Sequence, residues 1–290
     1  MRKITSAILA TALGVTMLSG SAMATDPVKE SNGLTAVQSQ KFEEEAEQSV
    51  KNYIKAIEKK DVEEMTKWVK DTRFQSIGEQ KQEYQKMFDV DPFSDFKIVD
   101  TKAKDDKNVN VTIQLTRKDT KQIEKVELPI IKDNDSKWKL VLGDAETKAQ
   151  NVTYTVRTGN EQAKNPVSTE GFTSIAYYEF FLHKAPGDFI YPAKTYSASS
   201  FDVIGNYVTI KGHQQESFHS PVYVLYQVVV KGLFTDDVKG GLLLNGYFPK
   251  TGTWYNYDFW VTPVKGAHLK ITNTSSETGS HGAGNVYEYR

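Results

Sequence analysis

The stretch PVYVLYQVVVKG, residues 221–232, decides the fold of the second half of this chain. Its apolar side chains occupy odd and even positions alike, so an extended strand built from it has no polar face. A strand of this kind is buried on both sides, as the central strands of covered sheets are. The stretch therefore predicts a central strand in the interior of a β domain.

Several other strand-like segments, separated by turns, surround this stretch. They are residues 173–182, 195–203, 205–211, 241–248, 253–262, 267–273 and 284–290. None of them shows the three- and four-residue repeat of an amphipathic helix. Many short strands at such spacing are typical of a sandwich or a jelly roll. We therefore expect residues 171–290 to form an all-β sandwich or jelly-roll domain.

The segment TGTWYNYDFWVTP, residues 251–263, is unusually rich in aromatic residues. Side chains alternate between the two faces of a strand, so one face is apolar and the other combines indole rings with polar groups. The second face carries the candidate ligand-binding residues Trp254, Asn256, Asp258 and Trp260. An indole that stacks on a sugar beside groups that bond its hydroxyls would suit a carbohydrate site. The same mixture would also suit a domain interface or a surface covered by a loop.

The first half of the chain has a different pattern, with helices before strands. KFEEEAEQSVKNYIKAIEKKD, residues 41–61, repeats apolar residues at helical spacing. Asp61 can cap a second helix, and Glu64 is placed as its capping-box partner. A third helical piece is expected at residues 79–88. Alternating strands follow at 108–116 and 121–131. Trp138, Leu140 and Leu142 alternate on a last strand, which includes KWKL at residues 137–140.

This order of elements resembles the nuclear transport factor two-like superfamily over residues 41–145. The resemblance implies an α+β cone-like domain, in which helices pack on a curved antiparallel sheet around an apolar pocket. Enzymes of that superfamily usually place His, Asp or Tyr inside the cone. Residues 41–145 contain no His. The resemblance therefore concerns the fold and implies no chemistry.

Composition divides the chain near residue 150. Of the 37 acidic residues, 26 precede residue 151 and 11 follow it, whereas all five His and 13 of the 15 Tyr lie after it. We therefore expect two domains, at 41–145 and 171–290, each with its own core. A flexible N-terminal segment at 25–40 and a linker at 146–170 complete the predicted organisation, because TGNEQAKNPVSTEG has the composition of a loop.

The N-terminus has the pattern of a secretory signal peptide. Arg2 and Lys3 precede a short apolar run, and Ser21-Ala22-Met23-Ala24 predicts cleavage after Ala24. The apolar run is shorter than the roughly 20 residues that a membrane span needs. The chain has no Cys, so an exported form would be stabilised without disulfides, which favours a bacterial secreted protein. The net charge of −1 offers no basic excess for nucleic acid.

Motifs for cofactors and metals are weak. His213, His219 and the pair Asp236-Asp237 could supply metal ligands, but their spacing matches no known site and the acidic pair reads first as a turn. GSHGAGN, residues 279–285, is rich in Gly but lacks the Lys and the helix of a phosphate loop, and we expect a flexible hairpin there. The sequence predicts no cofactor and no metal.

These observations favour a secreted, non-enzymatic binding protein, whose β domain contacts a cell-wall polymer, a glycan or a protein partner. The alternative is a secreted hydrolase with paired carboxylates in the β domain. The candidates for such a pair are Glu179, Asp202, Asp258 and Glu288. Membrane attack by the aromatic β domain ranks last, because the sequence lacks a long hairpin with the required alternation.

Overall fold

The computed structural model describes residues 34–148, 152–159, 171–182, 194–216, 220–275 and 278–289. The predicted signal peptide, and most of the predicted flexible segment at 25–40, lie outside these residues. The rest of that segment is helical, because the first helix begins at Ala36, where Thr35 caps it and pairs reciprocally with Gln38. The prediction of flexibility up to residue 40 is therefore wrong.

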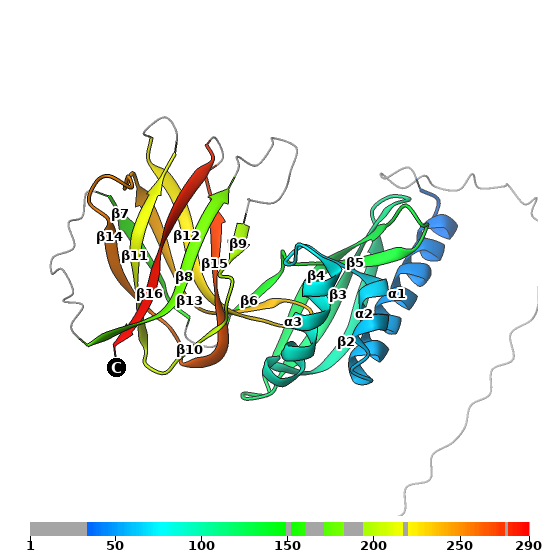
Figure 1. Ribbon diagram of the computed structural model, residues 1–290. Helices are drawn as coiled ribbons and strands as arrows, with labels where there is room; N and C mark the ends of the chain where they lie inside the picture. The colour runs from blue at the N-terminus through cyan, green and yellow to red at the C-terminus, as the bar shows by residue number, and fades with distance from the viewer. Residues whose placement is uncertain are drawn as a thin grey trace, which may run out of the picture.

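Three helices and five strands make up the first region, which we define as residues 34–145. They are α1 (Ala36–Glu58), α2 (Val62–Trp68), β1 (Val69–Asp71), α3 (Ile77–Val90), β2 (Phe93–Ala103), β3 (Asn108–Arg117), β4 (Ile123–Lys132) and β5 (Trp138–Leu142). The strands form one sheet in the order β1-β5-β4-β3-β2, and the helices pack beside it (Figure 1). As predicted, Asp61 caps α2, and the alternating side chains of β3 are buried on one face.

The remaining strands form the second region, residues 146–289. They are β6 (Glu146–Lys148), β7 (Tyr154–Thr158), β8 (Phe172–Leu182), β9 (Lys194–Tyr196), β10 (Phe201–Val203), β11 (Tyr207–Gln215), β12 (Val222–Lys231), β13 (Asp236–Gly246), β14 (Tyr255–Trp260), β15 (Val264–Asn273) and β16 (Ser280–Tyr289). A seven-stranded sheet follows the order β10-β15-β12-β13-β6, with β7 also on β13 and β9 on β15. A four-stranded sheet follows the order β14-β11-β16-β8.

The two sheets of the second region enclose one apolar core and form a β-sandwich. Strand β12 lies at the centre of the larger sheet, between β15 and β13, and eight of its ten residues are buried, on both faces of the strand. This confirms the central strand predicted from residues 221–232. Two strands within the predicted linker at 146–170, β6 and β7, pair in parallel with β13. The residues of these two strands therefore belong to the sandwich and not to a linker.

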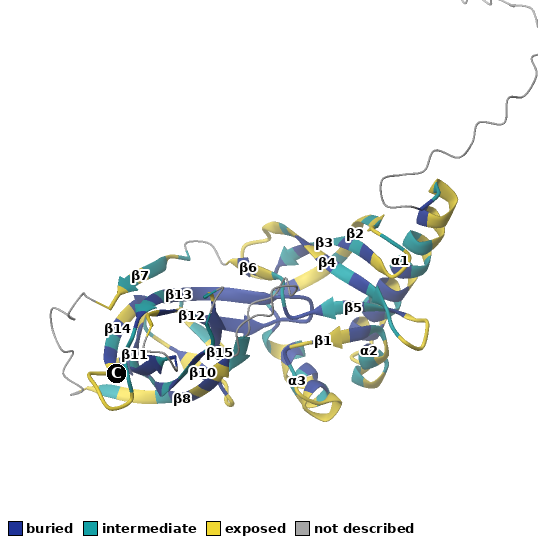
Figure 2. Cartoon of the chain, turned by 90° about the horizontal axis from the view of Figure 1, so that it is seen from above, coloured by how far each residue is buried: buried dark blue, intermediate teal, exposed yellow. Residues whose placement is uncertain are grey.

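The hairpin that joins β12 to β13 reaches out of the sandwich into the first region (Figure 1). We call residues 232–235 the hairpin tip. Leu233 and Phe234, at this tip, are buried in the same core cluster as the side chains of α1 and of β2–β5. The hydroxyl of Tyr53, on α1, donates a hydrogen bond to the carbonyl of Leu233 at 2.6 Å. The long run of buried residues through β13 toward this contact is visible in Figure 2.

The content of strands and helices corrects the predicted fold class. Strands make up 54% of the structure and helices 19%, with only three helices in the described part of the chain, so the protein is a mostly β fold and the predicted α+β cone-like domain is wrong. The interior expected to form an apolar pocket is filled by Leu233 and Phe234. Sequence patterns near residues 41–145 could not show this, because the filling residues come from the opposite half of the chain.

Two buried ion pairs fix the hairpin against the first region. The guanidinium of Arg117, on β3, donates to both carboxylate oxygens of Asp237 at 2.9 and 3.0 Å. Arg73 donates to Asp236 at 3.1 Å and to the carbonyl of Gly232 at 2.8 Å. The prediction of a turn at Asp236-Asp237 is therefore wrong: both residues lie in β13, and the turn is the hairpin tip. Arginine partners from the first region allow these carboxylates to be buried in a strand.

Two buried titratable groups near this contact respond to acid in opposite directions. Burial, reinforced by Lys231, lowers the pKa of His268 to about 4. Burial raises the pKa of Asp91 to about 6. As pH falls from about 6.5 to 4, the unfolded chain protonates His268 before the folded chain does, which lowers stability by up to about 3 kcal/mol. Over a similar range the folded chain protonates Asp91 first, which raises stability by a comparable amount.

We therefore predict that His268→Gln introduces a pH dependence of stability that the wild type lacks. In the wild type, the opposing effects of His268 and Asp91 should nearly cancel, so together they should change the free energy of unfolding little between pH 6.5 and 4. In His268→Gln, only the effect of Asp91 remains, so the stability of the variant relative to wild type should rise on acidification. Urea unfolding of both proteins at pH 4, 5, 6 and 7 measures this difference. Parallel curves for the two proteins would contradict the prediction.

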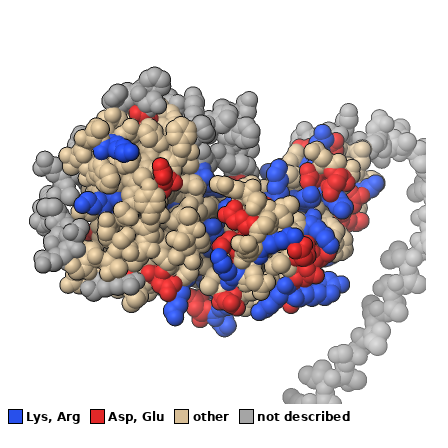
Figure 3. Space-filling view, viewed as in Figure 1, with Lys and Arg blue, Asp and Glu red and all other residues tan. Residues whose placement is uncertain are grey.

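Charged side chains crowd the visible surface of the first region and are sparse on that of the sandwich (Figure 3). This agrees with the change of composition near residue 150. In the described residues, no helix has the length and apolar character needed to cross a membrane.

Candidate functional site

The outer face of the four-stranded sheet carries the candidate site. On β14, Tyr255, Tyr257 and Phe259 are buried, whereas the residues between them point outward. Trp254, just before the strand, is 40% exposed. The period of two predicted for this segment is therefore present, and the apolar half of the stretch is core. The outward half lies on the sheet face opposite the seven-stranded sheet, and no sheet formed by the described residues covers it.

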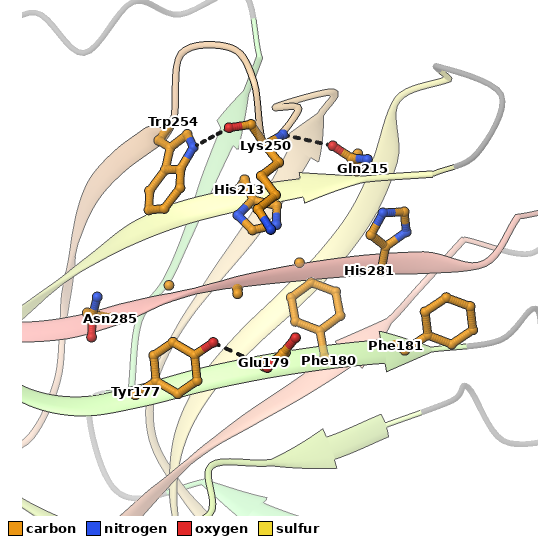
Figure 4. Close-up of a pocket in the computed structure, with 13 residues that line it drawn as sticks. Tyr177, Glu179, Phe180, Phe181, His213, Gln215, Lys250, Trp254, His281 and Asn285 are labelled. Atoms are coloured by element: carbon orange, nitrogen blue, oxygen red, sulfur yellow. Dashed lines mark hydrogen bonds between the residues drawn. The ribbon is translucent and has the colours of Figure 1, made fainter.

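A groove of about 670 Å³ lies on this outer face (Figure 4). A groove of this size is within the range of small-molecule sites. Side chains from β8, β11 and β16, and from the loop before β14, line it. They are Tyr177, Glu179, Phe180, Phe181, His213, Gln215, Lys250, Trp254, His281 and Asn285, together with the backbone of residues 282–284.

Trp254 and His213 form one wall of the groove. The indole nitrogen of Trp254 donates to the carbonyl of Lys250 at 3.0 Å, and the amide of Lys250 donates to Oε1 of Gln215 at 2.8 Å. The rings of Trp254 and His213 lie 5.3 Å apart and are tilted by 46°. These contacts hold the indole by its edge and leave part of its surface open, as Figure 4 shows.

Strand β8 supplies the opposite wall. Tyr177 and Phe181 are 55% and 69% exposed, and Glu179 points outward between them. The hydroxyl of Tyr177 donates to Glu179 at 3.3 Å. Phe181 stacks on His281 from the neighbouring strand, with ring centroids 5.9 Å apart. The two walls thus each present an aromatic ring and at least one hydrogen-bonding group.

Ala283 explains why the sheet is hollow between the walls. It pairs with His213 on one side and with Glu179 on the other, so the smallest side chain of β16's outward row lies between two larger ones. The adjacent Gly282 and Gly284 point inward, where a Cβ would lie 2.8 Å from the ring of Phe180 or 2.5 Å from the hydroxyl of Tyr178. Gly therefore serves the core here, and Ala283 shapes the groove.

Two groove residues have displaced pKa values: partial burial and the adjacent Glu179 raise the pKa of Tyr177, and the pKa of His213 is lowered. Burial, with a smaller contribution from Lys250, lowers the pKa of His213 below its ordinary value. The imidazole is therefore neutral at neutral pH and can both donate and accept hydrogen bonds. Its Nδ1 is buried without a hydrogen-bond partner in the structure.

The structure separates the four residues predicted to bind a ligand. Trp254 lines the groove, and Asn256 and Asp258 lie further along the same outward row of β14. Asp258 is exposed and accepts a hydrogen bond from the Thr209 hydroxyl at 2.5 Å. Trp260 lies six residues from Trp254, at the other end of β14, and lines no part of the groove.

The sequence offers Glu179 and His213 only as candidates for other chemistry, and it does not predict the groove residues on β8, β11 and β16 as one site. Their signals were present but weak: Tyr177, Glu179 and Phe181 alternate within the predicted strand 173–182. The GSHGAGN segment belongs mostly to β16 and pairs with both neighbouring strands, so the prediction of a flexible hairpin there is wrong. Only the register of four strands brings these residues together with Trp254, and register is not readable from one segment.

The four carboxylates proposed for a hydrolase do not meet. Glu179 lies on β8 and Asp258 on β14, at opposite edges of the sheet, and their registers on β11 differ by four residues. Three strand spacings across the sheet and four residues along it put them roughly 20 Å apart. Asp202 accepts a hydrogen bond from the amide of Gly266. Glu288 is buried and accepts from the amides of Ile204 and Gly205. The last two carboxylates therefore stabilise turns of the sandwich.

The alternative metal ligands are also dispersed. His213 lies in the groove, Asp236 and Asp237 pair with arginines beside the hairpin tip, and His219 lies outside the described residues. Within the parts of the chain that the structure describes, no three His, Asp or Glu residues are grouped so as to hold a metal ion.

Comparisons with known proteins give distant structural likenesses only. No family model and no curated protein matches the chain, so membership of the nuclear transport factor two-like superfamily stays a prediction. A glycoside hydrolase family 43 arabinoxylan arabinofuranohydrolase from Bacillus subtilis, solved with cellotetraose, aligns with 67% of this chain at 10% identity and a TM-score of 0.23. The CBM51-2 and INT domains of Clostridium perfringens ZmpB align with 66% at 12% identity and a TM-score of 0.20. The chain spans 40% of the length of each of these structures.

Proposed function

We propose that this protein is a secreted, non-enzymatic binding protein whose groove on the four-stranded sheet holds a carbohydrate. The observation that carries the proposal is the pairing of exposed rings with polar groups across one groove. Trp254 forms one wall, and Tyr177 and Phe181 the other. A sugar ring has an apolar C–H face that packs on such rings, and its hydroxyls need hydrogen-bond partners at the rim.

The polar groups of the groove suit hydroxyls. His213, Gln215 and Asn285 are neutral or amide groups that can donate and accept hydrogen bonds, and they lie on two adjacent strands between the walls. The charges of the groove are balanced, with Glu179 on one wall and Lys250 on the other. An uncharged ligand with many hydroxyls therefore fits these groups better than an anion or a cation. The predicted signal peptide supports a partner outside the cytoplasm.

The arrangement of carboxylates favours binding over hydrolysis. Canonical glycoside hydrolases place two carboxyl groups about 5–9.5 Å apart on either side of the bond that breaks. Among the described residues that line the groove, Glu179 is the one carboxylate, and the candidate partner on the outer face, Asp258, is roughly 20 Å distant by strand spacing and register. Within the described residues, the outer face therefore offers no carboxylate pair at the spacing that the hydrolase alternative requires.

We predict that Trp254→Ala weakens glycan binding about tenfold, or ~1.4 kcal/mol, because a partly exposed indole at the centre of a site supplies much of the binding energy. Affinity electrophoresis in gels that contain hydroxyethyl cellulose, xylan or glycol chitin, with a pull-down on purified peptidoglycan, measures this. Phe181→Ala, on the opposite wall, should weaken binding of the same glycan.

Tyr223→Ala is the matched control, because Tyr223 is 46% exposed on β12 of the other sheet. Its binding should equal that of the wild type. The melting temperatures of all three variants should stay within a few degrees of the wild type, which shows that the fold is retained. Retention of no glycan by the wild type would overturn the proposal, as would equal losses in Trp254→Ala and Tyr223→Ala. If the protein is retained only by the stem peptides of the peptidoglycan, the partner is a peptide instead.

A further inference from the structure

Beyond the groove, a second pair of aromatic rings lies on the same outer face. Trp260, the last residue of β14, pairs directly with Tyr207, the first residue of β11. Tyr207 is 61% exposed and Trp260 is half-buried. Directly opposed residues of an antiparallel pair have their Cβ atoms about 5 Å apart, so the two rings form one small platform. Core packing does not require Tyr207, because most of its surface is open to solvent.

Polar side chains occupy the outer face between this platform and the groove. On β14 they are Asn256 and Asp258, and on β11 they are Lys211 and Thr209, which pair with them in that order. Lys211 also pairs with Asn285, which lines the groove. A continuous row of hydrogen-bonding groups therefore joins the two aromatic ends, and Asp258 offsets the charge of Lys211.

We infer that the ligand is a long, uncharged polysaccharide strand that lies along β14 and β11, with one part in the groove and another on the Trp260–Tyr207 platform. The inference rests on the proposed carbohydrate function. Trp260 lies six positions after Trp254. At about 3.4 Å per residue, the two residues are roughly 20 Å apart along the strand. A disaccharide is too short to contact both rings, whereas an extended oligosaccharide of six units can do so.

The test compares short and long oligosaccharides on the purified protein by calorimetric titration. The probes are the disaccharide and the hexasaccharide of the cello-, xylo- and chito-series. For the series that binds, the hexasaccharide should bind the wild type at least tenfold more tightly than the disaccharide. Trp260→Ala and Tyr207→Ala should each remove most of this difference and leave the affinity for the disaccharide unchanged. Tyr223→Ala should alter neither affinity.

The outcomes separate this inference from the proposed function. If the disaccharide and the hexasaccharide bind equally and Trp254→Ala weakens both, the groove binds carbohydrate but the extended strand is wrong. If Trp260→Ala weakens the disaccharide as much as the hexasaccharide, the platform is not a separate contact and the inference again fails. If none of the three series binds and polygalacturonate does, the ligand is anionic and the inference is overturned. If no glycan binds at all, the proposed function fails as well.

Discussion

Asp237→Ala is expected to lower the free energy of unfolding by about 3–5 kcal/mol. Asp237 is fully buried and binds the Arg117 guanidinium through both oxygens, at 2.9 and 3.0 Å. Removal of the carboxylate leaves a buried guanidinium with one fewer counter-charge, which costs far more than the loss of an exposed pair. Urea unfolding followed by circular dichroism measures the change.

A surface pair supplies the matched control for this substitution. Asp100 and Lys102 lie 3.3 Å apart and are both exposed, so Asp100→Ala should change stability by less than about 1 kcal/mol. The double variant Arg117→Met with Asp237→Leu should lose less stability than the two single substitutions added together, because neither member of the pair is left buried without the other. Glu124 and Lys239 each lose one partner in it. Equal losses in Asp237→Ala and Asp100→Ala would show that the buried pair does not hold the hairpin.

Phe234→Ala is expected to lower the free energy of unfolding by a similar amount, about 3–5 kcal/mol. We expect this substitution to destabilise both halves of the chain. The ring of Phe234 lies 5.2 Å from that of Tyr53 and 4.7 Å from that of Phe96, and its residue is 1% exposed. Truncation leaves a cavity inside the first region, although Phe234 belongs to the hairpin of the sandwich. The test uses a Trp68→Phe, Trp138→Phe background, in which the remaining tryptophans, Trp254 and Trp260, lie in the sandwich. If the hairpin joins the two cores, helical circular dichroism and tryptophan fluorescence should shift to the same lower urea midpoint.

Phe181→Ala serves as the comparison for this variant, because it removes an equal ring that is 69% exposed. We expect a change within about 0.5 kcal/mol. A Phe234→Ala protein in which only the fluorescence of the sandwich or only the helical signal moves would show two independent domains. That result would restore the division of the chain into 41–145 and 171–290, which stays a prediction until such a measurement is made.

Local periodicity was enough to predict the elements that depend on near neighbours. The central position of residues 221–232 and the two faces of the Trp254–Trp260 segment follow from side-chain alternation along one strand. The helix after Asp61 follows from its cap. In each case the deciding contacts lie within a few residues, or require only that one face be apolar.

The sequence does not predict the features that depend on contacts between residues far apart in the chain. Asp236 and Asp237 have the composition of a turn, but arginines 163 and 120 positions away allow them to lie in a buried strand. The groove needs the register of four strands to bring Trp254 near Phe181. The same dependence explains why Trp254 was predicted together with Trp260 as one site: they share a face of β14, but only the neighbouring strands show that one lies in a groove and the other on a separate platform.

The contact of Tyr53 with Leu233 joins residues that are 180 positions apart in the chain. During synthesis α1 leaves the ribosome long before the hairpin tip that fills the core beside it. Contacts of such sequence separation form slowly, because a long loop must close before they stabilise anything. Until then the apolar faces of α1 and of β2–β5 remain open to chaperones or to other chains. The half of this protein that is made first therefore stays incomplete until part of the second half has been made.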